Sequence, residues 1–186
     1  MRFALVLLAV LPTSVFAADR IVTFSSPMYF LPPVKEIVFT KAGTPAPGDS
    51  KHEPLYAVPD LTNKLKTAEE GPYDIWFVPK DGKAIKAIAG FKVKEGTNEI
   101  KLNDHLGVIS FRGTDQPRGS LIVTAYDDEG PETKKHVVIQ AAGDTRAEMA
   151  VAPGDYAIWV VPQSGARARR VVDKIRVLAG KTATAD

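Results

Sequence analysis

The chain consists of short apolar runs separated by short polar breaks. The clearest runs are five to eight residues long, and Gly, Pro or Asp stands between one run and the next. Because successive side chains of a strand point to opposite faces, short runs bounded by turn formers predict β-strands. No segment after Ala17 combines a helical apolar period with helix caps; "LTNKLKTAEE" comes closest, and Leu61 and Leu65 alone do not make a helix face. The pattern predicts an all-β protein.

One of these runs occurs twice. The phrase "YDIWFVPKDG" (73–82) returns as "YAIWVVPQSG" (156–165), and seven of the twelve positions in 71–82 are identical to their counterparts in 154–165. "EIVFT" and "SLIVT" match upstream of the two phrases at a spacing of 84. Self-similarity at a fixed spacing indicates one structural unit built twice.

We therefore predict a first unit over 18–105 and a second unit over 106–186. The joint "KLNDHLG" contains turn formers and is so short that the two units are expected to touch. One segment breaks the symmetry: "KAGTPAPGDSKHEP" (41–54) reads as a long Pro/Gly loop without an equal in the second unit.

The repeated phrases also carry a family resemblance. "APGDYAIWVVPQSG" followed by "IRVLAGK", with "GSLIVTAYDDEG" as an opening strand, resembles carboxypeptidase-regulatory-like or transthyretin-like modules. The resemblance covers most of the second unit and about half of the first. It implies two tandem immunoglobulin-like or transthyretin-like β-sandwich units. Modules of this class are mostly non-catalytic and act in binding, spacing or assembly.

The segment 1–17 has the three parts of a secretory signal peptide. Arg2 is followed by nine apolar residues, Phe3 to Leu11, and "VFA" supplies a cleavage site after Ala17. Nine apolar residues are too few to cross a bilayer, which takes about 20. We expect a periplasmic or extracellular protein with no transmembrane segment once the leader is removed. The absence of cysteine, and hence of disulfides, favours a bacterial exported protein.

The net charge of the chain bears on which classes of partner it is expected to bind. The 24 basic and 22 acidic residues give a net charge of +2, which does not predict a nucleic-acid or membrane-surface partner.

The two tryptophans are the first candidates for binding. Alternation along the strand places Tyr73 and Ile75 on the core face, and Asp74 and Trp76 on the outer face, with Trp159 at the equivalent outer position. One interpretation is that loops of its own unit or the neighbouring unit cover each tryptophan. The other is that both rings are exposed and bind a sugar ring or a partner protein. Trp76, Trp159 and Asp74 are therefore candidate binding residues.

Two arginines complete the set of candidates. Arg167 and Arg169 alternate along "GARARRVVDKIR". Such a row of cations either protects a strand edge or meets an acidic glycan or an acidic patch on a partner.

The remaining chemistry is sparse. His52, His105 and His136 are isolated and match no metal-ligand spacing, and "YDDEGPE" lacks the spacing of a calcium loop but suits a turn. The sequence contains neither a nucleophile elbow nor a phosphate-binding glycine loop. We expect no metal, no cofactor and no enzyme activity, with a small enzyme using His52 or His105 as the least favoured hypothesis.

Together these features predict an exported, non-catalytic module for binding or assembly, whose partner is another exported or cell-surface protein. The contact surface is expected around Trp76 and Trp159, or along a strand edge such as "MYFLPPVKEI", where Pro32 and Pro33 cannot donate to a ladder. The alternative is carbohydrate binding through exposed tryptophans.

Overall fold

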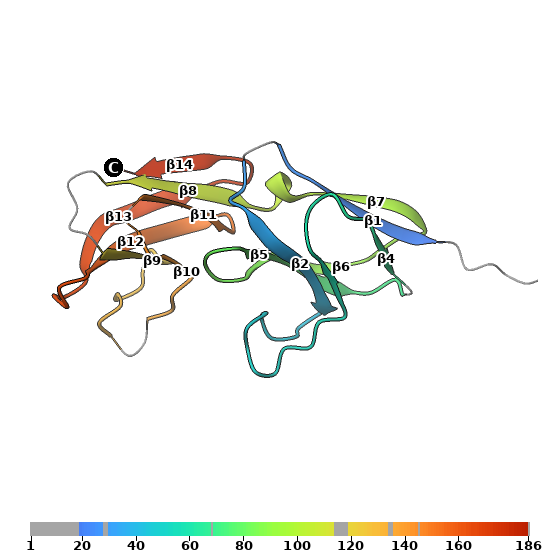
Figure 1. The fold of residues 1–186 in the computed structure, drawn as a ribbon, viewed down its shortest axis with the longest axis horizontal. Coiled ribbons are helices and arrows are strands. Elements are labelled where there is room, and N and C mark those ends of the chain that lie inside the picture. Colours follow the sequence, from blue (N-terminus) through green and yellow to red (C-terminus); the bar gives the residue numbers. More distant parts are fainter. Residues whose placement is uncertain are drawn as a thin grey trace, which may run out of the picture.

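The computed structural model describes residues 19–27, 30–67, 69–113, 119–133, 136–144 and 146–185; the predicted signal peptide lies outside these ranges. The described chain is all-β, as predicted, and its two units lie end to end (Figure 1). The strands of the first unit are β1 (Arg20–Ser25), β2 (Val34–Lys41), β3 (Tyr56–Val58), β4 (Leu65–Thr67), β5 (Tyr73–Pro79), β6 (Ile85–Phe91) and β7 (Gly96–Lys101). Those of the second unit are β8 (Gly107–Arg112), β9 (Gly119–Ala125), β10 (Gln140–Ala142), β11 (Arg146–Val151), β12 (Gly154–Pro162), β13 (Arg169–Val177) and β14 (Thr182–Ala185).

Each unit is a sandwich of a three-stranded and a four-stranded sheet. In the first unit the strand orders are β4-β1-β7 and β3-β2-β5-β6; in the second they are β11-β8-β14 and β10-β9-β12-β13. Every strand thus has a counterpart seven strands later with the same neighbours, including the parallel pairs β1–β7 and β8–β14. The predicted tandem sandwich with an internal repeat is confirmed.

The connectivity separates these units from the immunoglobulin constant domain. In that domain the first, second, fourth and fifth strands share one sheet. Here the second, third, fifth and sixth strands share the four-stranded sheet, and the first, fourth and seventh form the other. The units share the sandwich architecture of immunoglobulin domains but follow a different chain path.

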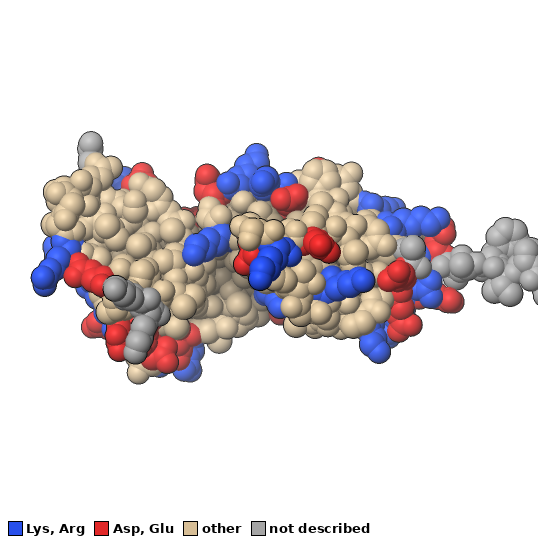
Figure 2. Space-filling model, turned by 90° about the horizontal axis from the view of Figure 1, so that it is seen from below, with Lys and Arg blue, Asp and Glu red and all other residues tan. Residues whose placement is uncertain are grey.

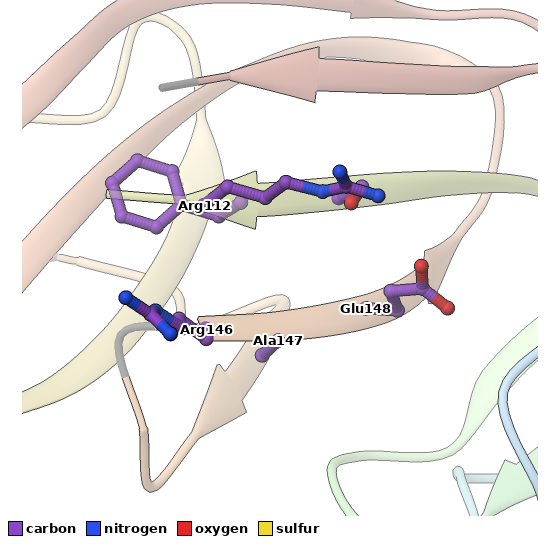
Figure 3. Close-up of a pocket in the computed structure, with 6 residues that line it drawn as sticks. Arg112, Arg146, Ala147 and Glu148 are labelled. Atoms are coloured by element: carbon purple, nitrogen blue, oxygen red, sulfur yellow. The ribbon is translucent and has the colours of Figure 1, made fainter. Parts of the chain in front are cut away.

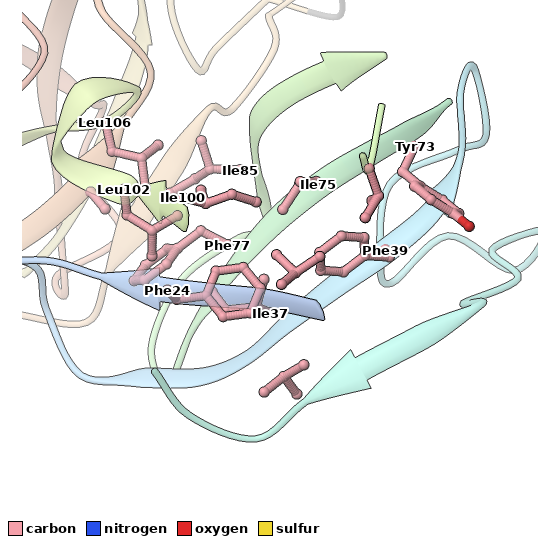
Figure 4. Packing of buried hydrophobic residues seen from close by; sticks show 14 residues of the cluster. Phe24, Ile37, Phe39, Tyr73, Ile75, Phe77, Ile85, Ile100, Leu102 and Leu106 are labelled. Atoms are coloured by element: carbon pink, nitrogen blue, oxygen red, sulfur yellow. The ribbon is translucent and has the colours of Figure 1, made fainter. Parts of the chain in front are cut away.

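The predicted core face is correct in both copies. Tyr73, Ile75 and Phe77 of β5 are buried, and so is the equivalent face of β12. Figure 4 shows side chains from β1, β2 and β5 filling the space between the first unit's sheets, where the Phe39 and Tyr73 rings meet edge to face with centroids 5.8 Å apart. The Tyr73 hydroxyl donates to the Glu69 carbonyl oxygen four residues upstream at 2.9 Å, which fixes the start of β5.

One sequence expectation is wrong. The 41–54 loop does have an equal: residues 42–55 join β2 to β3, and residues 126–139 join β9 to β10, so the two loops have the same length. Their compositions differ, because a loop that joins equivalent strands has to keep its length and not its residue types. Within "MYFLPPVKEI", Ile37 pairs on both sides, with Val58 of β3 and Phe77 of β5, whereas Val34 and Glu36 pair with β5 alone among the described strands; Met28 and Tyr29 lie outside the described residues.

The two units are fixed to each other by apolar contacts. A 3₁₀ turn, η1 (Leu102–Asp104), leads from β7 to β8. Leu102 and Leu106 are fully buried, and Ala150 of β11 packs into the core cluster of the first unit. The second unit therefore supplies part of the first unit's core.

A polar contact joins the units at a second point. Gln140 of β10 is 1% exposed. Its Oε1 accepts from the Lys83 N–H at 2.8 Å, and its Nε2 donates to the Lys83 carbonyl oxygen at 2.8 Å. The Lys83 ammonium in turn donates to the Val138 carbonyl oxygen at 2.9 Å. The side chain of Gln140 thus pairs with the β5–β6 turn much as a neighbouring strand would, and it opposes rotation of the units.

Candidate functional site

Trp76 is covered in the free protein. The side chain on β5 is 7% exposed, and its Nε1 donates to the Thr40 hydroxyl on β2 at 3.2 Å. The Lys86 ammonium on β6 lies 4.8 Å from the ring centroid, a cation–π arrangement. The indole is held between the strands on either side of β5, so it forms no open platform.

Trp159 repeats these surroundings. Its Nε1 donates to the Thr124 hydroxyl at 3.1 Å, and the Arg170 guanidinium lies 5.4 Å from its ring centroid. Trp159 is half-buried, and Gly130 of the 126–139 loop lies so close that a Cβ there would be 2.4 Å from the ring. The repeated phrase is thus accounted for by a repeated packing arrangement, in which threonine, tryptophan and a cation stand side by side on three neighbouring strands.

Asp74 anchors the structure around Trp76. It is 2% exposed; its Oδ2 accepts from the Gly43 N–H at 3.0 Å and from the Lys86 ammonium at 2.6 Å, while Oδ1 accepts from the Gly90 N–H at 3.0 Å. Burial alone raises the pKa of a carboxyl, but these three hydrogen bonds outweigh it and hold the pKa of Asp74 below its ordinary value. The carboxylate ties the β2–β3 loop and β6 to β5. The second unit has Ala157 at this position.

The candidate arginines lie in the second unit, just before β13 and at its first residue. Arg167 precedes the strand, is exposed, and stands 3.8 Å from the Glu132 carboxylate. Arg169 begins the strand and is exposed. The structure does not bring these two residues together with Trp76 or Asp74, which belong to the other unit.

The histidines and the acidic turn organise loops. His52 and His136 each place Nδ1 within 3.1 Å of a carbonyl oxygen in their own loop. Asp128 accepts from the N–H groups of Gly130 and Val137, which shapes the loop over Trp159. Among the described residues, no three His, Asp or Glu side chains are grouped to hold a metal ion.

A hollow of about 430 Å³ opens on the outer face of the β8–β11 pair. Arg112 and Arg146 stand directly opposite each other there, next to Glu148. Figure 3 shows the two guanidinium groups pointing in opposite directions along the sheet, so they do not converge on one ligand. Arg112 is also followed within two residues by the segment 114–118, which lies outside the described residues.

The edge strands β6 and β13, at equivalent sides of the two four-stranded sheets, differ between the units. Within the described chain β6 pairs only with β5, and β13, its counterpart, pairs only with β12. An edge strand offers unpaired N–H and C=O groups to other chains, and native proteins protect it with charges, prolines or bulges. Both edges have two register shifts at the same positions, so bulges protect them equally.

Charge does not protect them equally. Five of the nine residues of β13 are charged: Arg169, Arg170, Asp173, Lys174 and Arg176. Only one of the seven residues of β6 is charged, Lys86, and its ammonium is bound to Asp74. Ala89 and Gly90, just before the last residue of β6, are both exposed. We therefore take β6 as the candidate functional site, which the sequence predictions missed.

The surroundings of β6 are basic and hollowed. Residues 80–95 contain five lysines and two acids, a net charge of +3. A hollow of about 570 Å³ lies at the start of β6, between residues 46–49 of the β2–β3 loop and residues 82–84 of the β5–β6 turn, with Val78 and Lys35 among its walls. On the face seen in Figure 2, basic and acidic side chains both lie among uncharged surface.

Comparison with known proteins does not assign a family. No family model matches the chain, and no curated protein matches it. Among solved structures it is similar to the Bacillus anthracis TIE protein, with 12% sequence identity and a TM-score of 0.29 over 90% of this chain and 33% of that chain. The chain thus spans about a third of that protein, and a likeness this distant carries no argument about function.

No helix in the described part of the chain has the length and apolar character needed to cross a membrane.

Proposed function

We propose that this is an exported, non-catalytic module for protein binding and assembly in the periplasm or at the cell surface. Its two units are transthyretin-like or carboxypeptidase-regulatory-like modules. The partner, another exported or cell-surface protein, contributes an extended segment that pairs with β6 as an additional strand. In such strand addition, main-chain hydrogen bonds supply affinity, and the side chains that alternate along the added strand supply specificity.

The observation that carries this proposal is the contrast between β6 and β13. The two strands have the same place, the same partner and the same bulges, yet one has five charged residues and the other has one. If both edges had to resist pairing equally, the same protection would be expected on both. An edge whose single charge is already paired with Asp74, in one copy only, is consistent with selection for pairing there.

The fixed junction supports the same function. Lys83, which Gln140 holds through both ends of its amide, lies two residues before β6. A binding edge that is already ordered loses less conformational freedom when a partner docks. Carbohydrate binding through tryptophans has less support, because Trp76 is 7% exposed and part of Trp159 is covered by Gly130.

Selection of twelve-residue peptides from a display library of unbiased charge tests the proposal on the mature protein. Amide hydrogen exchange then maps where each selected peptide binds. Each peptide is also resynthesised in two versions, with N-methyl groups on one or the other set of alternate residues. Pairing with β6 predicts slowed exchange within β6. It also predicts that N-methylation abolishes binding in one of the two alternating sets and leaves it intact in the other.

Three results would overturn strand addition: no selected peptide, protection away from β6, or equal tolerance of both N-methylated sets. Ala166, an exposed residue of the β12–β13 turn, supplies the matched protein control. Ala89→Pro should abolish binding because it distorts the edge that the peptide contacts, whereas Ala166→Pro should not.

A further inference from the structure

We infer that the segment recognised by β6 is acidic: an extended strand whose small or apolar centre is flanked by carboxylates. This inference rests on the proposed function and names the chemistry of its partner. Lys80 and Lys83 precede β6, and Lys92 and Lys94 follow it. A strand laid along β6 would therefore have cations near both of its ends.

These cations are largely without internal partners. Lys80, Lys92 and Lys94 are exposed and take part in none of the ion pairs found among the described residues. The remaining two lysines are engaged, Lys86 with Asp74 and Lys83 with the Val138 carbonyl oxygen. Three ammonium groups thus remain available to an incoming acidic chain.

The cations of β13 are paired instead. Asp155 lies 2.9 Å from the Lys174 ammonium and 2.8 Å from the Arg176 guanidinium. Hydrogen bonds from Arg176 and Lys174 hold the pKa of Asp155 well below its ordinary value. Arg170 faces Asp173 at 3.5 Å. The second unit thus neutralises much of the charge on its own edge, whereas the first unit leaves its flanking lysines free.

The same charges argue against a second copy of this chain as the occupant. A two-fold pair of β6 strands runs antiparallel, since the same surface faces itself across the axis. That arrangement places Lys80 and Lys83 of each copy beside Lys92 and Lys94 of the other. Like charges across paired strands are destabilising, whereas an acidic strand in the same position meets opposite charges at both ends.

The space around β6 suits an extended chain. Ala89 and Gly90 are exposed and small, so a neighbouring backbone can approach them closely. The hollow of about 570 Å³ at the start of β6 gives a longer segment room to continue beyond the strand. Its walls include Lys35 and Lys83 as well as the acidic Glu36 and Asp49, so the acidic preference is assigned to the lysine flanks and not to this hollow.

Three synthetic peptides test the inference. They share one alternating Val-Thr core and differ only in their flanks, which are Glu-Glu, Gln-Gln or Lys-Lys. At low ionic strength the Glu-flanked peptide should bind about tenfold more tightly than the Gln-flanked peptide, because several weak exposed ion pairs add together. The Lys-flanked peptide should bind most weakly, and the difference should shrink as salt is added.

Protein variants locate the effect. Replacing Lys80, Lys92 and Lys94 by Gln should remove most of the preference for Glu flanks. Lys181→Gln, at an exposed lysine of the second unit, should leave it unchanged. These lysines make no internal ion pair among the described residues, so the variants should fold like the wild type.

The outcomes separate this inference from the proposed function. Equal affinity of the Glu- and Gln-flanked peptides, with β6 amides still protected, overturns the acidic partner and leaves strand addition standing. Failure of all three peptides to protect β6 overturns both. Concentration-dependent protection of β6 without any peptide would identify a second copy as the occupant and also overturn the acidic partner.

Discussion

Gln140→Ala is the substitution that most directly tests the fixed junction between the units. The wild-type side chain makes two hydrogen bonds of 2.8 Å with the Lys83 backbone and is 1% exposed. A neutral hydrogen bond contributes about 0.5–1.5 kcal/mol net, so the pair is worth about 1–3 kcal/mol. Because Lys83 is itself exposed, water can satisfy part of its backbone in the variant. We expect a loss of about 1–2 kcal/mol in the free energy of unfolding.

Urea unfolding gives the energy, and residual dipolar couplings give the relative orientation of the units. Gln163→Ala is the matched control, because Gln163 is exposed in the turn after β12. Gln140→Glu is a second variant: it keeps an acceptor for the Lys83 N–H but loses the donor and buries a charge, so it should cost at least as much as Ala. Gln140 does not fix the junction if Gln140→Ala matches Gln163→Ala within about 0.5 kcal/mol, the usual range for surface changes, and leaves the dipolar couplings of both units on one alignment tensor.

Three further predictions concern the tryptophan surroundings. Because the pKa of Asp74 is lowered in the fold, its carboxylate stabilises the folded protein above the unfolded pKa of about 3.9. This contribution is lost as the pH falls through the pKa of Asp74 in the folded protein. Asp74→Asn should therefore flatten the acid limb of a curve of stability against pH. Gly130→Ala should destabilise the protein by about 1–3 kcal/mol, since a Cβ would overlap Trp159 and the backbone φ is +97°; an unchanged melting temperature and unchanged Trp159 fluorescence would contradict this. Acrylamide should quench Trp159 in the Trp76→Phe variant more than it quenches Trp76 in the Trp159→Phe variant, and the reverse order would contradict the burial described here.

Periodicity predicted more of this protein than any single motif did. The spacing of 84 that aligned "EIVFT" with "SLIVT" also aligns Thr40 with Thr124, the two hydroxyls that accept from the tryptophans. Alternation correctly placed Tyr73 and Ile75 in the core, because sheet geometry leaves a strand residue only two directions to face. Loop composition was a poor guide to loop equivalence: the loops 42–55 and 126–139 differ in sequence, yet they have the same length and join equivalent strands.

The candidate site shows the limit of such inference. The difference between "IKAIAGF" and "RRVVDKIRV" is visible in the sequence. Its meaning depends on both strands being free edges, and strand order in a sheet is set by pairings between segments far apart in the chain. Local periodicity was enough to predict the strands, the repeat and the core face from the sequence. Which strands have a free edge, what covers each tryptophan and how Gln140 joins the two units could be seen only in the folded structure, because these depend on which distant residues come into contact.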